Sequence, residues 1–168
     1  MNTMFDEIYE LFFDRIVNDK KFFIPDIPPE ELEEMAMKRA KSLLMEAIAI
    51  ILTDGKLDAE VNFMDKDDDM EMFNFELTLI EKQLLADIML ECYIGKDLVT
   101  LTDLKTMYFT DTDLTMYSPN EGKKVLVNAY NELRSTNRQR IDNYKSRERL
   151  TYKYKTFDYG SLGTDYGN

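Results

Sequence analysis

Residues 65–76 read DKDDDMEMFNFE and place four carboxylates where an EF-hand loop places calcium ligands. These carboxylates, at relative positions 1, 3, 5 and 12, are Asp65, Asp67, Asp69 and Glu76. Met70 stands where the motif needs glycine for its sharp turn, and Phe73 stands where a water-bridging ligand is usual. The segment VNFM also separates the loop from the preceding predicted helix. We therefore expect a solvated acidic loop that attracts divalent cations only weakly, and we assign no metal ligand.

A second pattern, Asp111 and Asp113 followed by Glu121-Gly-Lys123, is similar to the carboxylate–lysine set of metal-dependent nucleases. Glu121, however, also completes a helix-capping box, and Lys123 suits an exposed first-turn position. Histidine is absent, which excludes histidine-based triads and histidine metal ligands. No glycine-rich phosphate loop occurs. The sequence therefore predicts a protein that is not an enzyme and needs no cofactor.

Charge is divided unevenly along the chain. Residues 1–120 hold 11 Lys/Arg against 27 Asp/Glu, whereas residues 121–168 hold 10 against 6. An acidic body argues against general nucleic-acid binding, which requires clustered cations. Cys92 is the only cysteine, so the chain can form no internal disulfide and no cysteine-based zinc site. The acidic start differs from a secretory signal, and the longest apolar stretch is too short to span a bilayer. We expect a soluble protein made in the cytosol, without membrane contact.

Apolar spacing predicts an all-α fold, a small helical bundle. One helix is expected over residues 5–16, and a second from Glu30 until Asp54-Gly55 ends it. An acidic loop, residues 54–74, follows, with possible short strands at VNFM and MFNF. A third helix begins at Thr78, where Thr78 and Glu81 form a capping box, and is expected to stop at Gly95. Residues 100–117 are expected to form a short helix and a loop.

A long C-terminal helix is predicted to begin at Ser118-Pro119-Asn120-Glu121, a cap followed by a proline in the first turn. Its early part carries an apolar stripe at Leu126, Tyr130 and Leu133. Its later part has only Ile141, Tyr144 and Leu150 as apolar contacts. We therefore expect this part to project from its own domain or to pack on another chain.

Residues 150–168 form a Tyr/Gly-rich segment with no helical period, which we expect to be an extended tail following a domain of residues 1–149. Its five aromatic residues are Tyr152, Tyr154, Phe157, Tyr159 and Tyr166. Such a segment is either a frayed terminus or a docking arm that orders on a partner. The number of aromatic side chains favours the docking arm.

Three parts follow one another in the second half of the chain: the stretch FELTLIEKQLLADIMLECYI, the segment DTDLTMYSPNEGKKVLVNAYNEL, and a charged helix with a Tyr-rich tail. In this order they resemble the head-to-tail connector proteins of tailed bacteriophages, also called adaptor or neck proteins. The resemblance covers roughly half the chain, lies in the order of helices and involves no signature motif. It implies a structural virion protein that forms a ring, commonly of twelve copies, below the capsid portal. The partners so implied are the portal protein and the next neck or tail-completion protein, with DNA only as passing cargo.

Two surfaces are expected to serve this role. The residues predicted to contact partners are Arg134, Arg138, Arg140, Tyr144, Arg147, Arg149 and the five tail aromatics. The residues predicted to line the channel, where negative charge repels DNA phosphates, are Asp65, Asp67, Asp68, Asp69 and Glu71. Two other hypotheses stay open. One is an acidic regulatory or decoy protein that binds a basic partner surface, and the other is a cation-binding module.

Overall fold

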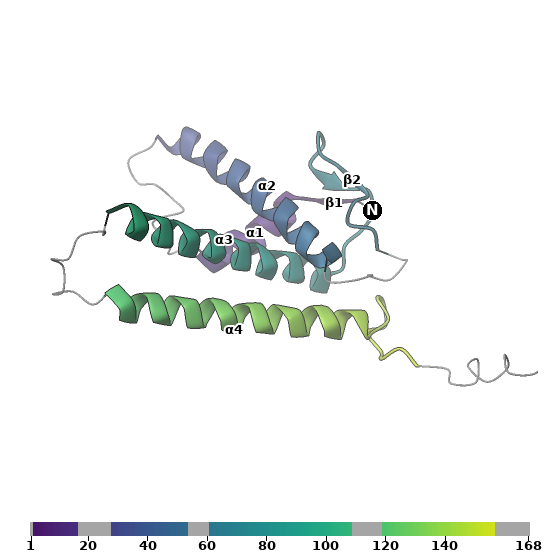
Figure 1. Ribbon diagram of the computed structural model, residues 1–168. Coiled ribbons are helices and arrows are strands. Elements are labelled where there is room, and N and C mark those ends of the chain that lie inside the picture. The colour runs from purple at the N-terminus through teal and green to yellow at the C-terminus, as the bar shows by residue number, and fades with distance from the viewer. Residues whose placement is uncertain (1, 17–27, 54–60, 109–118, 157–168) are drawn as a thin grey trace, which may run out of the picture.

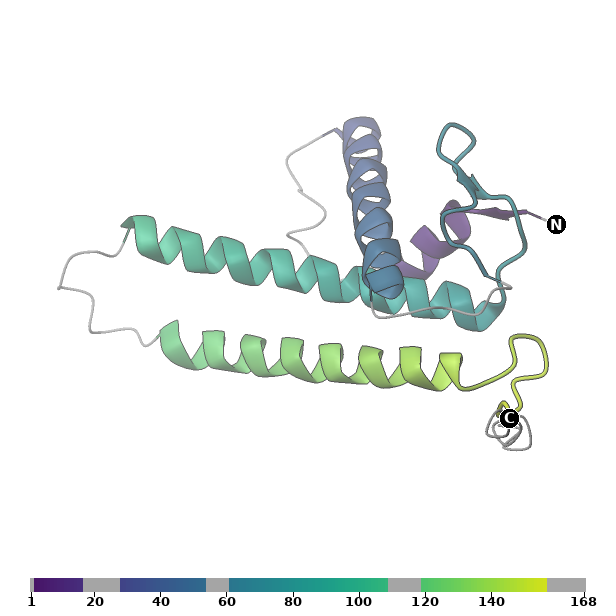
Figure 2. The same ribbon diagram turned by 45° about the vertical axis from the view of Figure 1, so that its right-hand side comes forward.

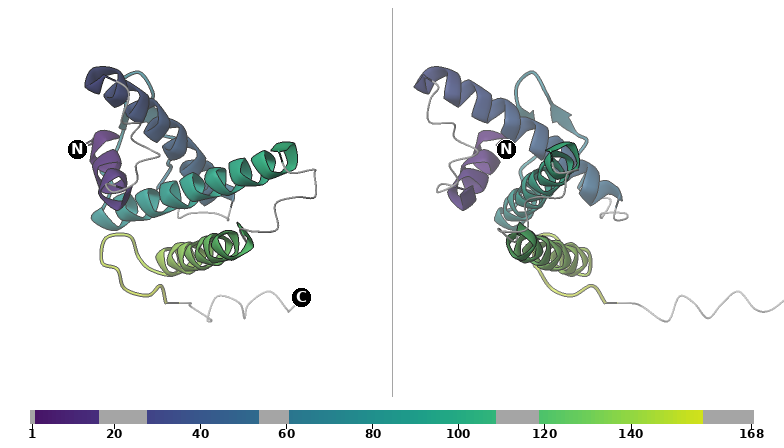
Figure 3. Two further views of the ribbon diagram at one scale, coloured as in Figure 1. Left: turned by 90° about the vertical axis from the view of Figure 1, so that its left-hand side faces the viewer. Right: turned by 60° about the vertical axis from the view of Figure 1, so that its left-hand side comes forward.

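The computed structural model describes residues 2–16, 28–53, 61–108 and 119–156, and the elements below lie in these ranges. In chain order they are β1 (Thr3–Met4), α1 (Asp6–Ile16), α2 (Pro29–Thr53), β2 (Lys66–Asp67), β3 (Met72–Phe73), α3 (Leu79–Tyr108) and α4 (Pro119–Lys145). α3 lies in the middle of the molecule, between α1 and α2 on one side and α4 on the other (Figure 1). α2 crosses α3 steeply, whereas α4 runs alongside α3 in the opposite direction (Figures 2 and 3).

The predicted first and second helices are confirmed, and both place their apolar stripes in one core. α1 buries Ile8, Phe12 and Ile16 on one face, at spacings of four residues. Between Leu43 and Ile51, α2 lies against α3 and buries five apolar residues, Leu43, Leu44, Ala47, Ile48 and Ile51. The largest fully buried side chains are Phe5, Ile8, Tyr9, Phe12, Leu44, Ile51, Phe63, Phe73, Leu85, Ile88 and Met89.

The fold is mostly helical but not all-α, because a small antiparallel sheet joins the chain's start to its acidic segment. The strand order is β1-β3-β2, with Thr3 opposite Phe73 and Lys66 also opposite Phe73. The expected strand at MFNF is observed over Met72–Phe73, whereas VNFM is not a strand. Phe73 anchors the sheet to the core through edge-on contacts with Phe5 and Phe63, whose ring centroids lie 5.1 Å and 6.1 Å away. The acidic segment is thus part of the folded body from residue 61 onward.

The expected end of the third helix at Gly95 is wrong, because α3 continues to Tyr108. A glycine inside a helix costs about 1 kcal/mol relative to alanine. At this position the missing side chain makes room for Tyr130 of α4, since a Cβ on Gly95 would lie 3.3 Å from the Tyr130 ring. Close packing between α3 and α4 therefore explains why Gly95 lies inside a helix, although glycine by itself favours a helix end. Residues 100–117 are expected from the sequence to form a short helix and a loop. Residues 100–108 instead continue α3, and residues 109–117 lie outside the described ranges.

The expectation that the later part of α4 projects from the domain is also wrong. α4 packs along α3, and Asn137, Ile141 and Tyr144 are all buried. Pro119 opens the helix as predicted, while its proposed cap, Ser118, lies outside the described residues. Within the described residues, no helix combines the length and the apolar composition needed to cross a membrane.

The chain after α4 folds back instead of extending at once. Arg147 pairs with Tyr154 in an antiparallel bridge, and the backbone N–H of Glu148 donates to the carbonyl of Lys153 at 2.8 Å. Tyr152 adopts a left-handed conformation with φ of 58°, which closes the turn. Residues 146–155, hereafter the C-terminal turn, are therefore ordered against the body. The predicted docking residues Phe157, Tyr159 and Tyr166 lie outside the described ranges, as do Asp111 and Asp113.

Candidate functional site: the α3–α4 seam and the C-terminal turn

The face of α3 that meets α4 repeats at alternating spacings of four and three residues. Its members are Glu81, Leu84, Ile88, Glu91 and Gly95. This spacing is that of two helices packed side by side at a shallow angle. Two of the positions are carboxylates, so the seam needs polar partners on α4 to compensate their burial. The close contacts of this α3–α4 seam are consequently a series of ion pairs and hydrogen bonds along two antiparallel helices.

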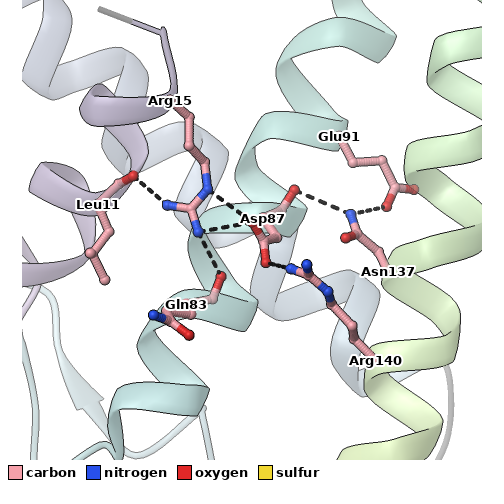
Figure 4. A network of polar contacts seen from close by, with 7 residues as sticks. All are labelled: Leu11, Arg15, Gln83, Asp87, Glu91, Asn137 and Arg140. Carbon is pink, nitrogen blue, oxygen red and sulfur yellow. Dashed lines mark hydrogen bonds and ion pairs between the residues drawn. The ribbon is translucent and has the colours of Figure 1, made fainter.

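Asp87 lies near the middle of the seam and joins three helices (Figure 4). Its Oδ1 accepts from Arg15 of α1, with Nε at 2.9 Å and Nη2 at 2.8 Å. Its Oδ2 is ion-paired with Arg140 of α4. Arg15 also donates to the carbonyls of Leu11 and Gln83. One carboxylate thus fixes two arginines that approach α3 from opposite sides.

Asn137 provides the next contact along the seam. It is 1% exposed, and its Nδ2 donates to the Asp87 carbonyl at 3.2 Å and to Glu91 Oε2 at 2.9 Å (Figure 4). The other oxygen of Glu91 lies 4.0 Å from Nε of Arg134. A buried asparagine with two specific acceptors fixes the axial register of α4 on α3, because a shift by one turn would leave its amide unpaired.

Glu81 is the most buried charged group of the seam, with no exposed surface. Its capping-box bond is confirmed, since its Oε2 accepts from the Thr78 backbone N–H at 2.7 Å. The same carboxylate accepts from Arg149 Nε at 2.7 Å and Nη2 at 3.0 Å, and from the hydroxyl of Tyr144. Arg149 also donates to the carbonyl of Glu76. Glu81 therefore ties the first turn of α3 to α4 and to the C-terminal turn.

Burial alone raises the pKa of a carboxyl such as Glu81. Here the hydrogen bonds from Arg149, Tyr144 and the Thr78 N–H outweigh burial and hold the pKa of Glu81 below its usual value. Burial, and then the bond to the Glu81 carboxylate, raise the pKa of the Tyr144 hydroxyl. The bond to Glu81 likewise raises the pKa of Arg149. The cluster is thus stable with Glu81 and Arg149 charged and Tyr144 neutral.

Arg147 organises the C-terminal turn itself. Its guanidinium carbon lies 4.7 Å from the ring centroid of Tyr152 and 4.3 Å from that of Tyr154. It also donates to the Tyr152 carbonyl at 3.2 Å and to the Tyr154 hydroxyl at 2.9 Å. One arginine therefore holds two of the predicted tail aromatics in place.

The predicted partner-contact residues that the structure describes differ in their burial and in their contacts. Tyr144 is buried inside the seam and is not at the surface, because its hydroxyl satisfies the carboxylate of Glu81. Arg140 and Arg149 are engaged within the chain by Asp87 and Glu81. Arg134 and Tyr154 are exposed, and Arg138, Arg147 and Tyr152 are half-buried. The basic residues therefore do not form one uniform docking face.

The predicted channel-lining residues lie together in the acidic hairpin, residues 65–73. Asp67 accepts from the backbone N–H groups of Asp69 and Met70, both at 2.9 Å, and so shapes the turn. Asp65 accepts from the Asn74 amide at 2.7 Å, and Asp68 is ion-paired with Lys66. Glu71, in a left-handed conformation with φ of 50°, is paired with Lys41 of α2 at 2.7 Å.

The hydrogen bonds and ion pairs of residues 65–73 are those of a β-hairpin and not those of an EF-hand loop. In the part of the chain that the structure describes, no group of three or more His, Cys, Asp or Glu side chains is arranged to hold a metal ion.

A groove of about 250 Å³ opens on the seam. It is lined by Ile80, Gln83, Leu84, Asp87, Arg140, Asn143, Tyr144 and Tyr152. Its one carboxylate, Asp87, is paired with two arginines and is therefore not placed to act as a general base.

Sequence reasoning assigned Glu81 to capping alone and did not identify Asp87, Glu91 or Asn137. Glu81 and Glu91 could have been found from the sequence, because they continue the alternating spacing of three and four residues on α3 once polar residues are included in the pattern.

Comparison with family models, curated proteins and solved structures finds no match to this chain.

Proposed function

We propose that this protein is a ring-forming structural adaptor of a tailed bacteriophage, which joins the capsid portal to the neck or tail and continues the DNA channel. The observation that carries the proposal is the separation of charge across α3. The acidic hairpin lies on one side of α3, and α4 with the C-terminal turn lies on the other (Figures 1 and 2). A subunit with opposite charges on opposite sides suits assembly with further copies.

The described contacts support a structural role in a second way. The seam fixes α4 against the body through the Arg140–Asp87 ion pair, the hydrogen bond from Tyr144 to Glu81 and the buried amide of Asn137. The ion pair between Arg149 and Glu81 fixes the C-terminal turn in the same way. A subunit built in this way presents its charged surfaces in fixed positions, as a ring component must. The overall negative charge of residues 1–120 gives a channel wall that repels DNA phosphates and lets DNA pass. Residues beyond 156 remain as the proposed contact with the portal.

Light scattering over a concentration series, with negative-stain images of the largest species, tests the proposal. Closed rings of identical subunits support the adaptor. Monomers at every concentration, without rings in the images, count against it and favour an acidic decoy that binds a basic partner surface. The exposed acidic hairpin is the observation that favours this second candidate.

Two truncations separate these candidates further. Removal of residues 151–168 deletes Tyr152 and Tyr154, whereas removal of residues 157–168 keeps the C-terminal turn. For an adaptor we expect the longer deletion to abolish assembly, whereas a decoy should bind its partner equally well after either deletion. Circular dichroism of both truncated proteins checks that the helical body remains folded.

A further inference from the structure

Exposed apolar side chains gather at two places on the molecule. Five of the nine most exposed large apolar residues in the described part of the chain lie on or beside the sheet, or in the C-terminal turn. Those of the sheet are Met4 (43% exposed), Met64 (59%) and Met70 (60%). Those of the turn are Leu150 (80%) and Tyr154 (63%). Grouped exposed apolar residues indicate an interaction surface.

The two places carry opposite charge. The acidic hairpin, residues 65–73, holds five carboxylates and one lysine, a net charge of −4. The C-terminal turn, residues 146–155, holds four cations and one carboxylate, a net charge of +3. Asp69 in the hairpin and Lys153 in the turn are both exposed and carry opposite charges. The exposed apolar residues of the sheet are therefore bordered by negative charge, and those of the C-terminal turn by positive charge. The two surfaces are complementary in both hydrophobicity and charge.

The two surfaces cannot meet within one copy. The sheet and the C-terminal turn lie at the same end of the molecule but on opposite sides of α3 (Figures 1 and 2). The turn is held there by Arg149, which binds Glu81 on α3, and the hairpin is held by Glu71, which binds Lys41 on α2. A contact between them therefore requires two molecules. Such a contact joins different patches on the two copies, and repetition closes a ring or extends a filament.

We propose that the acidic hairpin with its exposed methionines is the docking surface for the C-terminal turn of a second copy of this chain. The inference rests on the adaptor function and names its subunit contact. It assigns the hairpin to the interface between neighbours and not to the channel wall. Met64 and Met70 adapt to the side chains of Leu150 and Tyr154, while Lys153 faces the aspartates of the hairpin turn.

Charge reversal in two variants tests the contact. One variant carries Asp68→Lys and Asp69→Lys, and the other carries Lys153→Glu. Each reversal places like charges at the interface, so we expect each variant alone to need roughly tenfold or more protein for half-assembly. An equimolar mixture of the two should recover assembly, because every contact then joins either two native or two reversed surfaces. Glu132→Lys, on an exposed position of α4, is the matched control and should assemble like the wild type.

Disulfide trapping measures the same contact without requiring a closed ring. In a Cys92→Ala background, Asp69→Cys and Lys153→Cys in one chain should form a ladder of covalent oligomers on oxidation. Asp142→Cys in place of the cysteine at residue 153 is the control and should give no ladder. If each reversed variant forms rings normally and the double-cysteine chain gives no ladder, this interface is overturned while the adaptor function stands. A wild-type chain that forms no rings, together with a double-cysteine chain that forms no ladder, overturns both.

Discussion

Arg149 donates two hydrogen bonds to the carboxylate of Glu81, at 2.7 Å and 3.0 Å, and so connects the C-terminal turn to the first turn of α3. The two residues are separated by 68 positions in the sequence. Glu81 has no exposed surface, and Tyr144 of α4 shares the same carboxylate. The position of the proposed docking turn on the body therefore depends on one buried acidic side chain.

Replacement Glu81→Gln should lower the free energy of unfolding by about 3 kcal/mol, because it leaves the guanidinium of Arg149 without its counter-charge in a buried site. Urea unfolding followed by circular dichroism measures the change. Glu132→Gln, at an exposed position of α4, is the matched control and should change stability by less than about 0.5 kcal/mol. Equal stability of both variants would show that the Glu81 pair does not hold the turn.

The pKa of Glu81 also predicts a dependence of stability on pH. Its pKa in the folded protein lies below the ordinary value of 4.5. The stabilisation is therefore fully present above pH 4.5 and is lost as the pH falls through the folded pKa. The difference in unfolding free energy between wild type and Glu81→Gln should shrink as the pH is lowered below 4.5. A difference that stays constant to pH 2 would contradict the assignment.

Replacement Asp87→Asn should lower the free energy of unfolding by about 2 kcal/mol, because Arg15 and Arg140 both lose their counter-charge. The partly exposed arginines can recover water, which keeps the cost below that expected for Glu81. A double-mutant cycle between Arg15→Gln and Asp87→Asn should give a coupling energy larger than that of Arg140→Gln with Asp87→Asn. The reason is that the Arg140 side chain is 54% exposed and that of Arg15 only 24%.

Replacement Gly95→Leu should lower the free energy of unfolding by about 2 kcal/mol, since a larger side chain at this position meets the Tyr130 ring and separates α3 from α4. Gly95→Ala should have a small effect, because the gain in helix propensity of about 1 kcal/mol offsets a contact of 3.3 Å that a half-buried ring can relieve. Thermal unfolding of both variants measures the difference. Tyr130→Ala should rescue Gly95→Leu, and a failure to rescue would place the cost elsewhere.

Cys92 should react slowly with thiol reagents in the folded protein. Burial, and secondarily the nearby charges of Glu46 and Glu91, raise the pKa of its thiol to about 12. At pH 8 the reactive thiolate is then roughly a thousand times rarer than for an ordinary cysteine. A disulfide-exchange reagent monitored by absorbance should therefore react fast only after denaturant is added. Rapid reaction of the folded protein would contradict this placement.

The sequence correctly predicted those helices whose apolar spacing and capping residues match the side chains that are buried in the fold. The first two helices have apolar stripes at helical spacing, and the Thr78–Glu81 capping box marks the beginning of α3. The sequence did not predict that Gly95 lies inside α3, because the space for Tyr130 depends on another helix. It also missed the packing of α4, since the buried face of that helix includes Asn137, a polar residue that an apolar pattern leaves out.

The division of charge and most helical segments follow from residue types and their spacing along the chain, and could be predicted without a fold. The pairing of Asp87 and Glu81 with arginines more than fifty positions away is visible only in the folded chain. Only the fold placed the acidic hairpin and the C-terminal turn on opposite sides of α3. The physical reason is that buried charges are stable only beside partners from other elements, and no local pattern specifies which distant residue will supply the opposite charge.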